Sequence, residues 1–138
     1  MVVDPSTVFR QAAEYYLLKC PDIESVQALS GLAGLEKECF IFKPHILLID
    51  YKLLKNCRDA LSLCAGIKKN MPALIIAANF LYQDSRCSDS LKQTGISALS
   101  VSKQNFVHDV KHLIHMAGFR KDEQFSQDCR KLKGGNTR

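Results

Sequence analysis

Several features that would place this chain in a membrane are missing from its 138 residues. The longest apolar runs are far shorter than the roughly 20 residues that a membrane-spanning helix needs. The opening residues, MVVDP, do not resemble a secretory signal peptide, which has a basic start and a longer apolar stretch. The length is that of one domain. We therefore expect a single cytoplasmic domain with no membrane partner.

The motifs of several enzyme classes are also missing. The chain has no glycine-rich loop after its first strand candidate, no Cys-x5-Arg phosphate cradle and no nucleophile elbow. A small α/β enzyme, such as a phosphatase or a flavodoxin-like protein, is therefore the least favoured class. We expect that the protein is not an enzyme.

Cysteine is present, but not at the spacing of a zinc site. No two cysteines are separated by two residues, and in a reducing compartment most cysteines are small, partly buried apolar residues. A redox-sensing thiol is the alternative, although no sequence feature selects one. The six positions are Cys20, Cys39, Cys57, Cys64, Cys87 and Cys129.

The positive charge is concentrated in the last part of the chain. The net charge is +5, and residues 119–138 hold six basic and three acidic side chains. The remainder is nearly balanced, so a solvated tail is favoured over a nucleic-acid-binding surface. We predict a domain over residues 1–118 and a basic C-terminal extension or linker over residues 119–138.

Short apolar segments alternate with helical patterns along the chain. Residues 46–49 and 73–78 are unbroken apolar runs, as in strands buried on both faces of a parallel sheet. Weaker strand candidates are residues 2–3, 23–28 and 98–101. Helical spacing marks the segments around residues 8–17, 32–39, 60–67 and 106–114, and Gly118 is placed to end the last helix. Residues 84–93 are a further helix candidate, although this segment is polar and poorly patterned.

This order predicts an α/β fold. Strands that alternate with helices form a parallel sheet with helices on both faces. We expect five parallel strands flanked by five helices in a doubly wound, flavodoxin-like arrangement. In such sheets, ligands bind beyond the carboxyl ends of the strands.

Three charged residues follow predicted strands and are expected at that edge. Asp4 follows the first strand, Asp50 follows residues 46–49, and Lys103 follows the last strand. Two nearby carboxylates suit Mg²⁺, an aspartate can be the nucleophile in phosphoryl transfer, and a lysine can contact phosphate. Each residue taken alone also fits a helix cap, a turn or a solvated surface position.

Residues 2–117 resemble the receiver domain of two-component response regulators. The resemblance is carried by VVDP at 2–5, FRQA at 9–12, CPDIE at 20–24, KPHILLID at 43–50, GISA at 95–98 and SK at 102–103. The segment at 43–50 has the form of the family's strand that ends at the phosphoacceptor aspartate.

The resemblance implies a phosphorylation switch. A histidine kinase would transfer a phosphoryl group to Asp50, and Lys103 would contact the phosphoryl oxygens. Mg²⁺ would be held by Asp4, Asp50 and the backbone carbonyl of Lys52. The switched surface would serve a homodimer or an output domain, absent from this chain, that binds DNA in transcriptional regulation.

The chain departs from the family pattern at several positions. The family has two adjacent acids after its first strand, whereas here Asp4 precedes Pro5, so Mg²⁺ binding is expected to be weaker. The family's hydroxyl after strand four falls near Ala77 or Ala78, and Asn79 is the nearest polar residue. These departures support a second hypothesis, an atypical receiver-like interaction or dimerisation module that works without phosphorylation.

The histidines offer a further metal-site alternative. His108 and His112 are four residues apart, so they share one face of the predicted last helix. No carboxylate or cysteine accompanies them at ligand spacing, so a solvated helix face is favoured.

Overall fold

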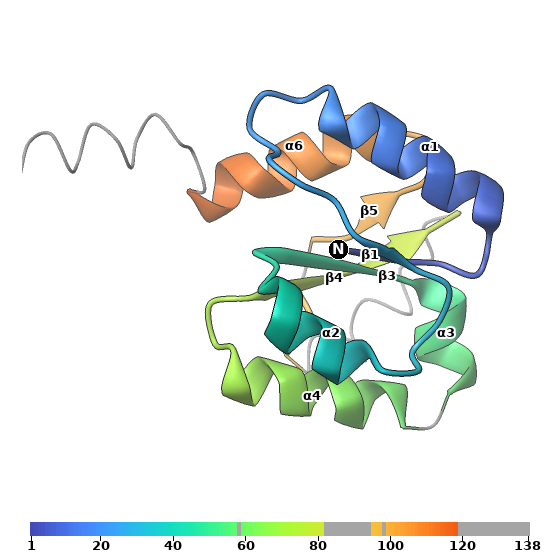
Figure 1. The fold of residues 1–138 in the computed structure, drawn as a ribbon, viewed down its shortest axis with the longest axis vertical. Helices are drawn as coiled ribbons and strands as arrows, with labels where there is room; N and C mark the ends of the chain where they lie inside the picture. The colour runs from blue at the N-terminus through green and yellow to red at the C-terminus, as the bar shows by residue number, and fades with distance from the viewer. Residues whose placement is uncertain (58, 82–94, 98, 119–138) are drawn as a thin grey trace, which may run out of the picture.

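The computed structural model describes residues 1–57, 59–81, 95–97 and 99–118, and within these it contains a five-stranded parallel sheet. The strand order is β2-β1-β3-β4-β5, which is the flavodoxin-like order. Figure 1 shows the sheet between two groups of helices. The strands are β1 (Val2–Val3), β2 (Ala28–Leu29), β3 (Ile46–Asp50), β4 (Ile75–Phe80) and β5 (Val101–Ser102).

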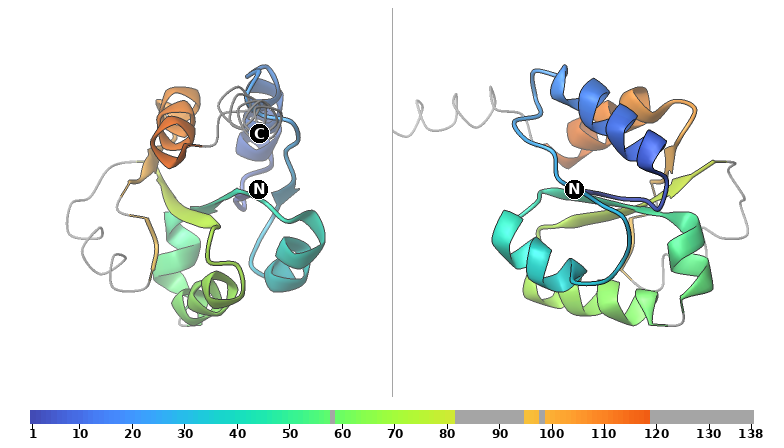
Figure 2. Two further views of the ribbon diagram at one scale, coloured as in Figure 1. Left: turned by 90° about the vertical axis from the view of Figure 1, so that its left-hand side faces the viewer. Right: turned by 45° about the vertical axis from the view of Figure 1, so that its right-hand side comes forward.

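Five helices in the described residues cover both faces of the sheet, as the two views of Figure 2 show. α1 and α6 lie on one face, and α2, α3 and α4 lie on the other. The predicted α/β fold is confirmed. The helices are α1 (Thr7–Leu18), α2 (Leu35–Phe42), α3 (Tyr51–Asn56), α4 (Ala60–Asn70) and α6 (Phe106–Ala117).

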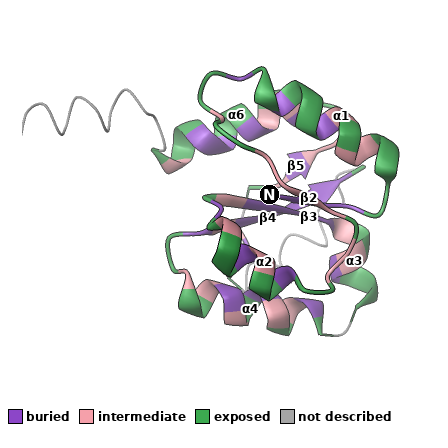
Figure 3. Ribbon diagram, viewed as in Figure 1, coloured by how far each residue is buried: buried purple, intermediate pink, exposed green. Residues whose placement is uncertain are grey.

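The unbroken apolar run of β3 is explained by burial on both faces. Leu47 and Ile49 pack in the core under α2, α3 and α4, whereas Leu48 packs in the core under α1 and α6. Successive side chains of a strand point to opposite faces, so both sets must be apolar. Figure 3 shows the resulting buried layer between exposed outer helix faces.

Local capping signals set the limits of the first and last helices. The Ser6 side chain accepts a hydrogen bond from the Phe9 N–H and caps α1. Gly118 adopts the left-handed conformation with φ 72° and ends α6, as its position predicts.

Some element bounds differ from the sequence prediction. The strand predicted over 23–28 is wrong, because Ile23 and Val26 pack against the core without strand pairing, and β2 contains only Ala28 and Leu29. β4 begins two residues later than predicted, where the Ile75 N–H donates to the His45 carbonyl.

Two further differences concern helices and the last strand. α3 was not predicted, and six residues are too few to show a helical period. β5 begins at Val101, the last residue of the range predicted for it. The helix predicted over 84–93 and the extension over 119–138 lie outside the described residues.

The helices are amphipathic or short, and none in the described part of the chain is long and apolar enough to cross a membrane.

Candidate functional site

Three predicted site residues meet at the carboxyl edge of the sheet. Lys103 Nζ lies 2.7 Å from Asp4 Oδ2 and 3.2 Å from Asp50 Oδ1. Both aspartates are almost completely buried, and the lysine side chain is 16% exposed. β1 and β3 are neighbours, so the ends of these two strands bring the carboxylates to one place. We call Asp4, Asp50 and Lys103 the carboxylate cluster.

Asp4 is held by the turn that leads into α1. Its Oδ1 accepts the Ser6 N–H at 2.8 Å, and its backbone carbonyl accepts Arg10 Nη1 at 2.6 Å. The turn role that the sequence left open is therefore real, but it uses only one carboxylate oxygen. Oδ2 remains directed at Lys103, so the same residue serves the turn and the cluster.

Asp50 is the last residue of β3 and directly precedes α3. Although it occupies the N-cap position, its side chain makes no capping hydrogen bond. A helix-capping role therefore does not explain this buried carboxylate. Among the residues that the structure describes, the Asp50 side chain forms an ion pair with Lys103.

Lys103 is fixed at its backbone and at its ammonium. Its N–H donates to the Phe80 carbonyl at 2.7 Å, which ties the chain after β5 to the end of β4. The ammonium lies 4.8 Å from the centre of the Phe9 ring, a cation–π distance. Burial lowers the pKa of Lys103, but hydrogen bonds and charge attraction from Asp4 and Asp50 outweigh it, so the pKa is raised above 10.5.

Asn79 is a fourth polar residue at this edge. It pairs in register with Asp50 on the adjacent strand, is 1% exposed, and neither of its amide atoms has a hydrogen-bond partner among the described residues. The resemblance placed the expected hydroxyl near Ala77 or Ala78, but these lie opposite Leu48 and Ile49. The available signal was a single polar residue in an otherwise apolar strand.

The residues present fit a divalent cation in charge. Two carboxylates and one ammonium leave one net negative charge, and a phosphoryl group would add to it. Mg²⁺ favours one or two carboxylates with phosphate oxygens and water. The described residues contain no group of three or more His, Cys, Asp or Glu side chains that could hold a metal. An ion here would therefore depend on Asp4, Asp50, water and the phosphoryl group.

The predicted third ligand, the Lys52 backbone carbonyl, lies in the first turn of α3. The free backbone groups at a helix start are N–H groups, and the carbonyls point along the helix toward its end. The Lys52 carbonyl would therefore serve as a ligand only if this turn opened. Its role stays a prediction.

The histidine alternative does not form a metal site in the described part of the chain. The side chain of His108 is 86% exposed, and its Nδ1 lies 3.4 Å from Asp109 Oδ1. Cys20, Cys39 and Cys64 are buried and free, as the sequence predicts for small apolar residues, whereas Cys57 is exposed.

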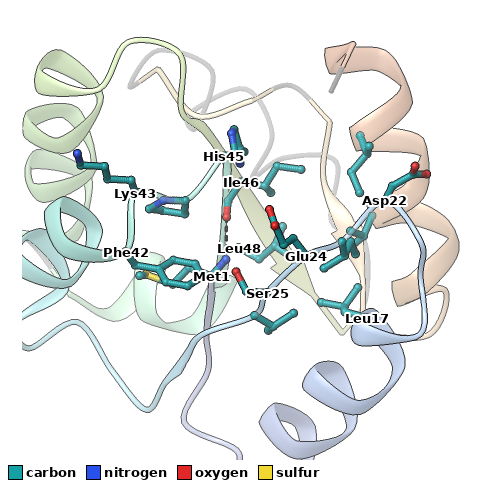
Figure 4. Close-up of a pocket in the computed structure, with 15 residues that line it drawn as sticks. Met1, Leu17, Asp22, Glu24, Ser25, Phe42, Lys43, His45, Ile46 and Leu48 are labelled. Carbon is teal, nitrogen blue, oxygen red and sulfur yellow. Dashed lines mark hydrogen bonds between the residues drawn. The ribbon is translucent and has the colours of Figure 1, made fainter. Parts of the chain in front are cut away.

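A hollow of about 390 Å³ lies at the opposite edge of the sheet (Figure 4). Its lining includes the apolar side chains of Leu48 and Ile114, with Asp22 and Glu24 among its polar groups. The Met1 nitrogen donates to the Ile46 carbonyl beside it, at the start of β3. The carboxylate cluster lies at the other end of β3, so the two features are separate.

Comparison with known proteins supports the fold. No protein-family model and no curated protein matches the chain. A LuxR-family two-component response regulator from Aurantimonas sp. SI85-9A1 has a TM-score of 0.71 at 17% identity, over 87% of this chain and 84% of that one. The RcsB response regulator of Salmonella typhimurium has a TM-score of 0.66 at 16% identity, over 86% of this chain. This chain spans 59% of that RcsB chain.

A third match is a Burkholderia pseudomallei response regulator that was solved with a phosphorylated aspartic acid and a calcium ion. Its TM-score is 0.65 at 17% identity, over 96% of this chain and 72% of that one. The chain therefore has the fold of a response-regulator receiver domain, and the predicted resemblance is confirmed at the level of fold. At 16–17% identity the likeness does not extend to activity.

Proposed function

We propose that this chain is the receiver module of a two-component pathway and that Asp50 accepts a phosphoryl group from a histidine kinase. The observation that carries the proposal is that carboxylate oxygens of Asp4 and Asp50 lie 2.7 and 3.2 Å from the Lys103 ammonium. The Burkholderia pseudomallei structure, with its phosphorylated aspartic acid and calcium ion, supports this use of the fold.

The proposed reaction is a phosphoryl transfer between two side chains. A carboxylate oxygen of Asp50 bonds to phosphorus, the bond from phosphorus to the kinase histidine nitrogen breaks, and the nitrogen keeps the electron pair. Positioning and charge stabilisation supply most of the catalysis in such reactions. Bound Mg²⁺, held by Asp4, Asp50 and water, would neutralise charge on the transferring group, and the Lys52 carbonyl would join these ligands if the first turn of α3 opened.

Lys103 provides the fixed positive charge of the site. Its ammonium is shared by two carboxylates, and phosphorylation of Asp50 would raise the negative charge on one side of it. We expect Lys103 to shift from Asp4 toward the phosphoryl oxygens. The buried position of Asp50 limits the access of water that would hydrolyse the product.

The consequence for signalling would be a changed surface for a homodimer or for an output domain. RcsB from Salmonella typhimurium, one of the structural relatives, is described in terms of DNA interaction. By analogy, the output here would be DNA binding by a domain outside this chain. A cytoplasmic location accords with such a pathway.

A test with matched variants separates Asp50 from other aspartates. The protein is incubated with acetyl phosphate and Mg²⁺, and its intact mass is measured beside Asp50→Asn and Asp59→Asn. Asp59 is an exposed aspartate before α4. Addition of one phosphoryl group to the wild type and to Asp59→Asn, but not to Asp50→Asn, is the expected result. Equal addition to all three proteins would contradict the proposal.

The second candidate is a receiver-like interaction module that works without phosphorylation. It is favoured by the single acid after β1, because one oxygen of Asp4 is already bonded to the Ser6 N–H. In that case Lys103 is a permanent counter-charge that holds the strand ends together. The folded wild type would then gain no mass, with or without Mg²⁺.

A further inference from the structure

Two hollows flank α6, and they differ in charge. The first is the hollow of about 390 Å³ in Figure 4, with Ile114 of α6 in its wall and Asp22 and Glu24 in its lining. We call it the acidic hollow. The second hollow, of about 380 Å³, lies beside Met116 of α6, and the charged residue that the structure describes in its lining is Lys68. An apolar hollow with acidic side chains fits a basic partner that also carries an apolar side chain.

The acids of the acidic hollow have no partner among the described residues. Neither Asp22 nor Glu24 has a side-chain hydrogen bond or an ion pair there. The lining also contains Lys43 and His45. In Figure 4, Asp22 lies beside α6, whereas Lys43 lies across the hollow at the end of α2. The side of the hollow next to α6 is therefore the acidic side.

The N-terminal amine adds little positive charge to this hollow. The Met1 nitrogen lines it and donates to the Ile46 carbonyl. Burial lowers the pKa of the Met1 amine to about 6, so most of it is neutral at pH 7. The two carboxylates therefore face a nearly uncharged wall at the start of β3.

The chain leaves α6 on the side of the acidic hollow. Gly118 ends α6, and its N–H donates to the carbonyls of Ile114 and His115. Residues four apart lie on the same face of a helix, so Gly118 follows Ile114 on the face that lines this hollow. The segment after Gly118 is thus attached beside the hollow.

The positive charge of that segment is concentrated in one short run. Residues 129–133, with the sequence CRKLK, hold three basic side chains and one leucine, whereas residues 119–128 hold two basic and three acidic side chains. The ten residues between Gly118 and this run reach at most about 35 Å. A partner tethered through so short a connection has an effective concentration in the millimolar range, so even weak binding is populated.

We propose that residues 129–133 dock in the acidic hollow, with the Leu132 side chain on its apolar floor and the basic side chains paired with Asp22 and Glu24. The second hollow offers Lys68 in place of acids, so like charges disfavour it for this run. While docked, the three basic side chains are held by the domain and are not available to an acidic partner. The acidic hollow and Asp50 lie at opposite ends of β3, so the docking does not depend on phosphorylation.

A single tryptophan tests the docking in the full chain, because the sequence contains none. Leu132→Trp places the ring at the proposed contact, and Asn136→Trp places it beyond the docked run. At low salt we expect Leu132→Trp to emit at a shorter wavelength than Asn136→Trp and to be quenched less by acrylamide. In 1 M salt, where the Debye length is about 3 Å, the two spectra should approach each other.

Neutralising the acids tests the hollow as the docking surface. In the Leu132→Trp protein, the pair Asp22→Asn and Glu24→Gln should weaken docking roughly 2- to 30-fold, the worth of two exposed ion pairs, and shift the emission to longer wavelength. The matched control is the pair Glu36→Gln and Asp59→Asn, which removes the same charge from exposed positions on α2 and before α4. This control should leave the emission unchanged.

Three outcomes would overturn the inference. Equal emission from Leu132→Trp and Asn136→Trp at low salt would show that the run does not dock. A shift that survives neutralisation of the acids but is lost in Met116→Ser would place the run on the second hollow. A shift that grows with protein concentration would make the contact one between two molecules. Phosphorylation of Asp50 is measured separately, so none of these outcomes bears on the proposed function.

Discussion

Replacing Lys103 by methionine removes the ammonium but keeps most of the apolar length of the side chain. At the observed distances of 2.7 and 3.2 Å, the two ion pairs have gross attractions of about 6 and 5 kcal/mol at an effective dielectric constant of about 20. The desolvation of the buried charges offsets several kcal/mol of this sum. The variant leaves two buried carboxylates without a counter-charge, so we expect a loss of about 3–5 kcal/mol in the free energy of unfolding.

The assay is urea unfolding at pH 7, followed by circular dichroism. Lys37→Met is the matched control, because Lys37 is exposed on α2, and it should change the free energy of unfolding by less than about 0.5 kcal/mol. If Lys103→Met were no more destabilising than Lys37→Met, the ion pairs would not form in solution, and the reasoning from the cluster would be refuted.

The pH dependence gives a second measure of the same interaction. The folded pKa of Lys103 is raised above 10.5, so the stabilisation is fully present below about pH 10.5 and is lost as the pH rises through the folded value. The difference in stability between the wild type and Lys103→Met should therefore narrow only above that pH. A difference that vanished already at pH 9 would contradict the raised pKa.

Two further predictions concern the packing around the cluster and the thiols. Phe9→Leu should lower the free energy of unfolding by roughly 1–2 kcal/mol, measured in urea, because the Phe9 ring contacts the Lys103 ammonium and packs edge-on against Phe106 at 5.1 Å. Iodoacetamide at pH 8 should alkylate the exposed Cys57 in the native protein but reach Cys64 only after unfolding, because burial raises the pKa of the Cys64 thiol to about 11. By the same shift, stability should fall as the pH rises from 9 to 11.

Each of these predictions has a comparison that can contradict it. Phe40 is an exposed phenylalanine on α2. If Phe40→Leu and Phe9→Leu lowered the free energy of unfolding equally, the ring contacts of Phe9 would add no stability beyond that of an exposed ring. For the thiols, peptide mapping by mass spectrometry gives the rate at each cysteine. Equal rates at Cys57 and Cys64 in the native state would contradict the burial of α4 against the sheet.

The elements that the sequence predicts best are those in which burial and strand pairing coincide. Residues 46–49 of β3 are an unbroken apolar run before Asp50, and both faces of the strand are covered. β2 was misplaced because Ile23 and Val26 are apolar for packing and not for pairing. An apolar pattern indicates that side chains are buried. Strand pairing also requires the backbone to lie beside a neighbouring strand with which it can form hydrogen bonds.

The candidate site was predictable to the extent that strand ends define it. Asp4, Asp50 and Lys103 follow three strands of one parallel sheet, and the general rule for such sheets brings them to one edge. Asn79 was not predicted at this edge, because the sequence prediction ended the strand at residue 78. β4 runs to Phe80, and its pairing register with β3 places Asn79 opposite Asp50.

The central claim is that Asp50 carries the phosphoryl group, and locating that group tests it most directly. After reaction with acetyl phosphate and Mg²⁺, borohydride reduction converts an aspartyl phosphate to homoserine, which peptide sequencing by mass spectrometry locates. The account predicts homoserine at position 50, with Mg²⁺ required. Homoserine at another aspartate, or none in the folded protein, would contradict the account and favour a module that works without phosphorylation.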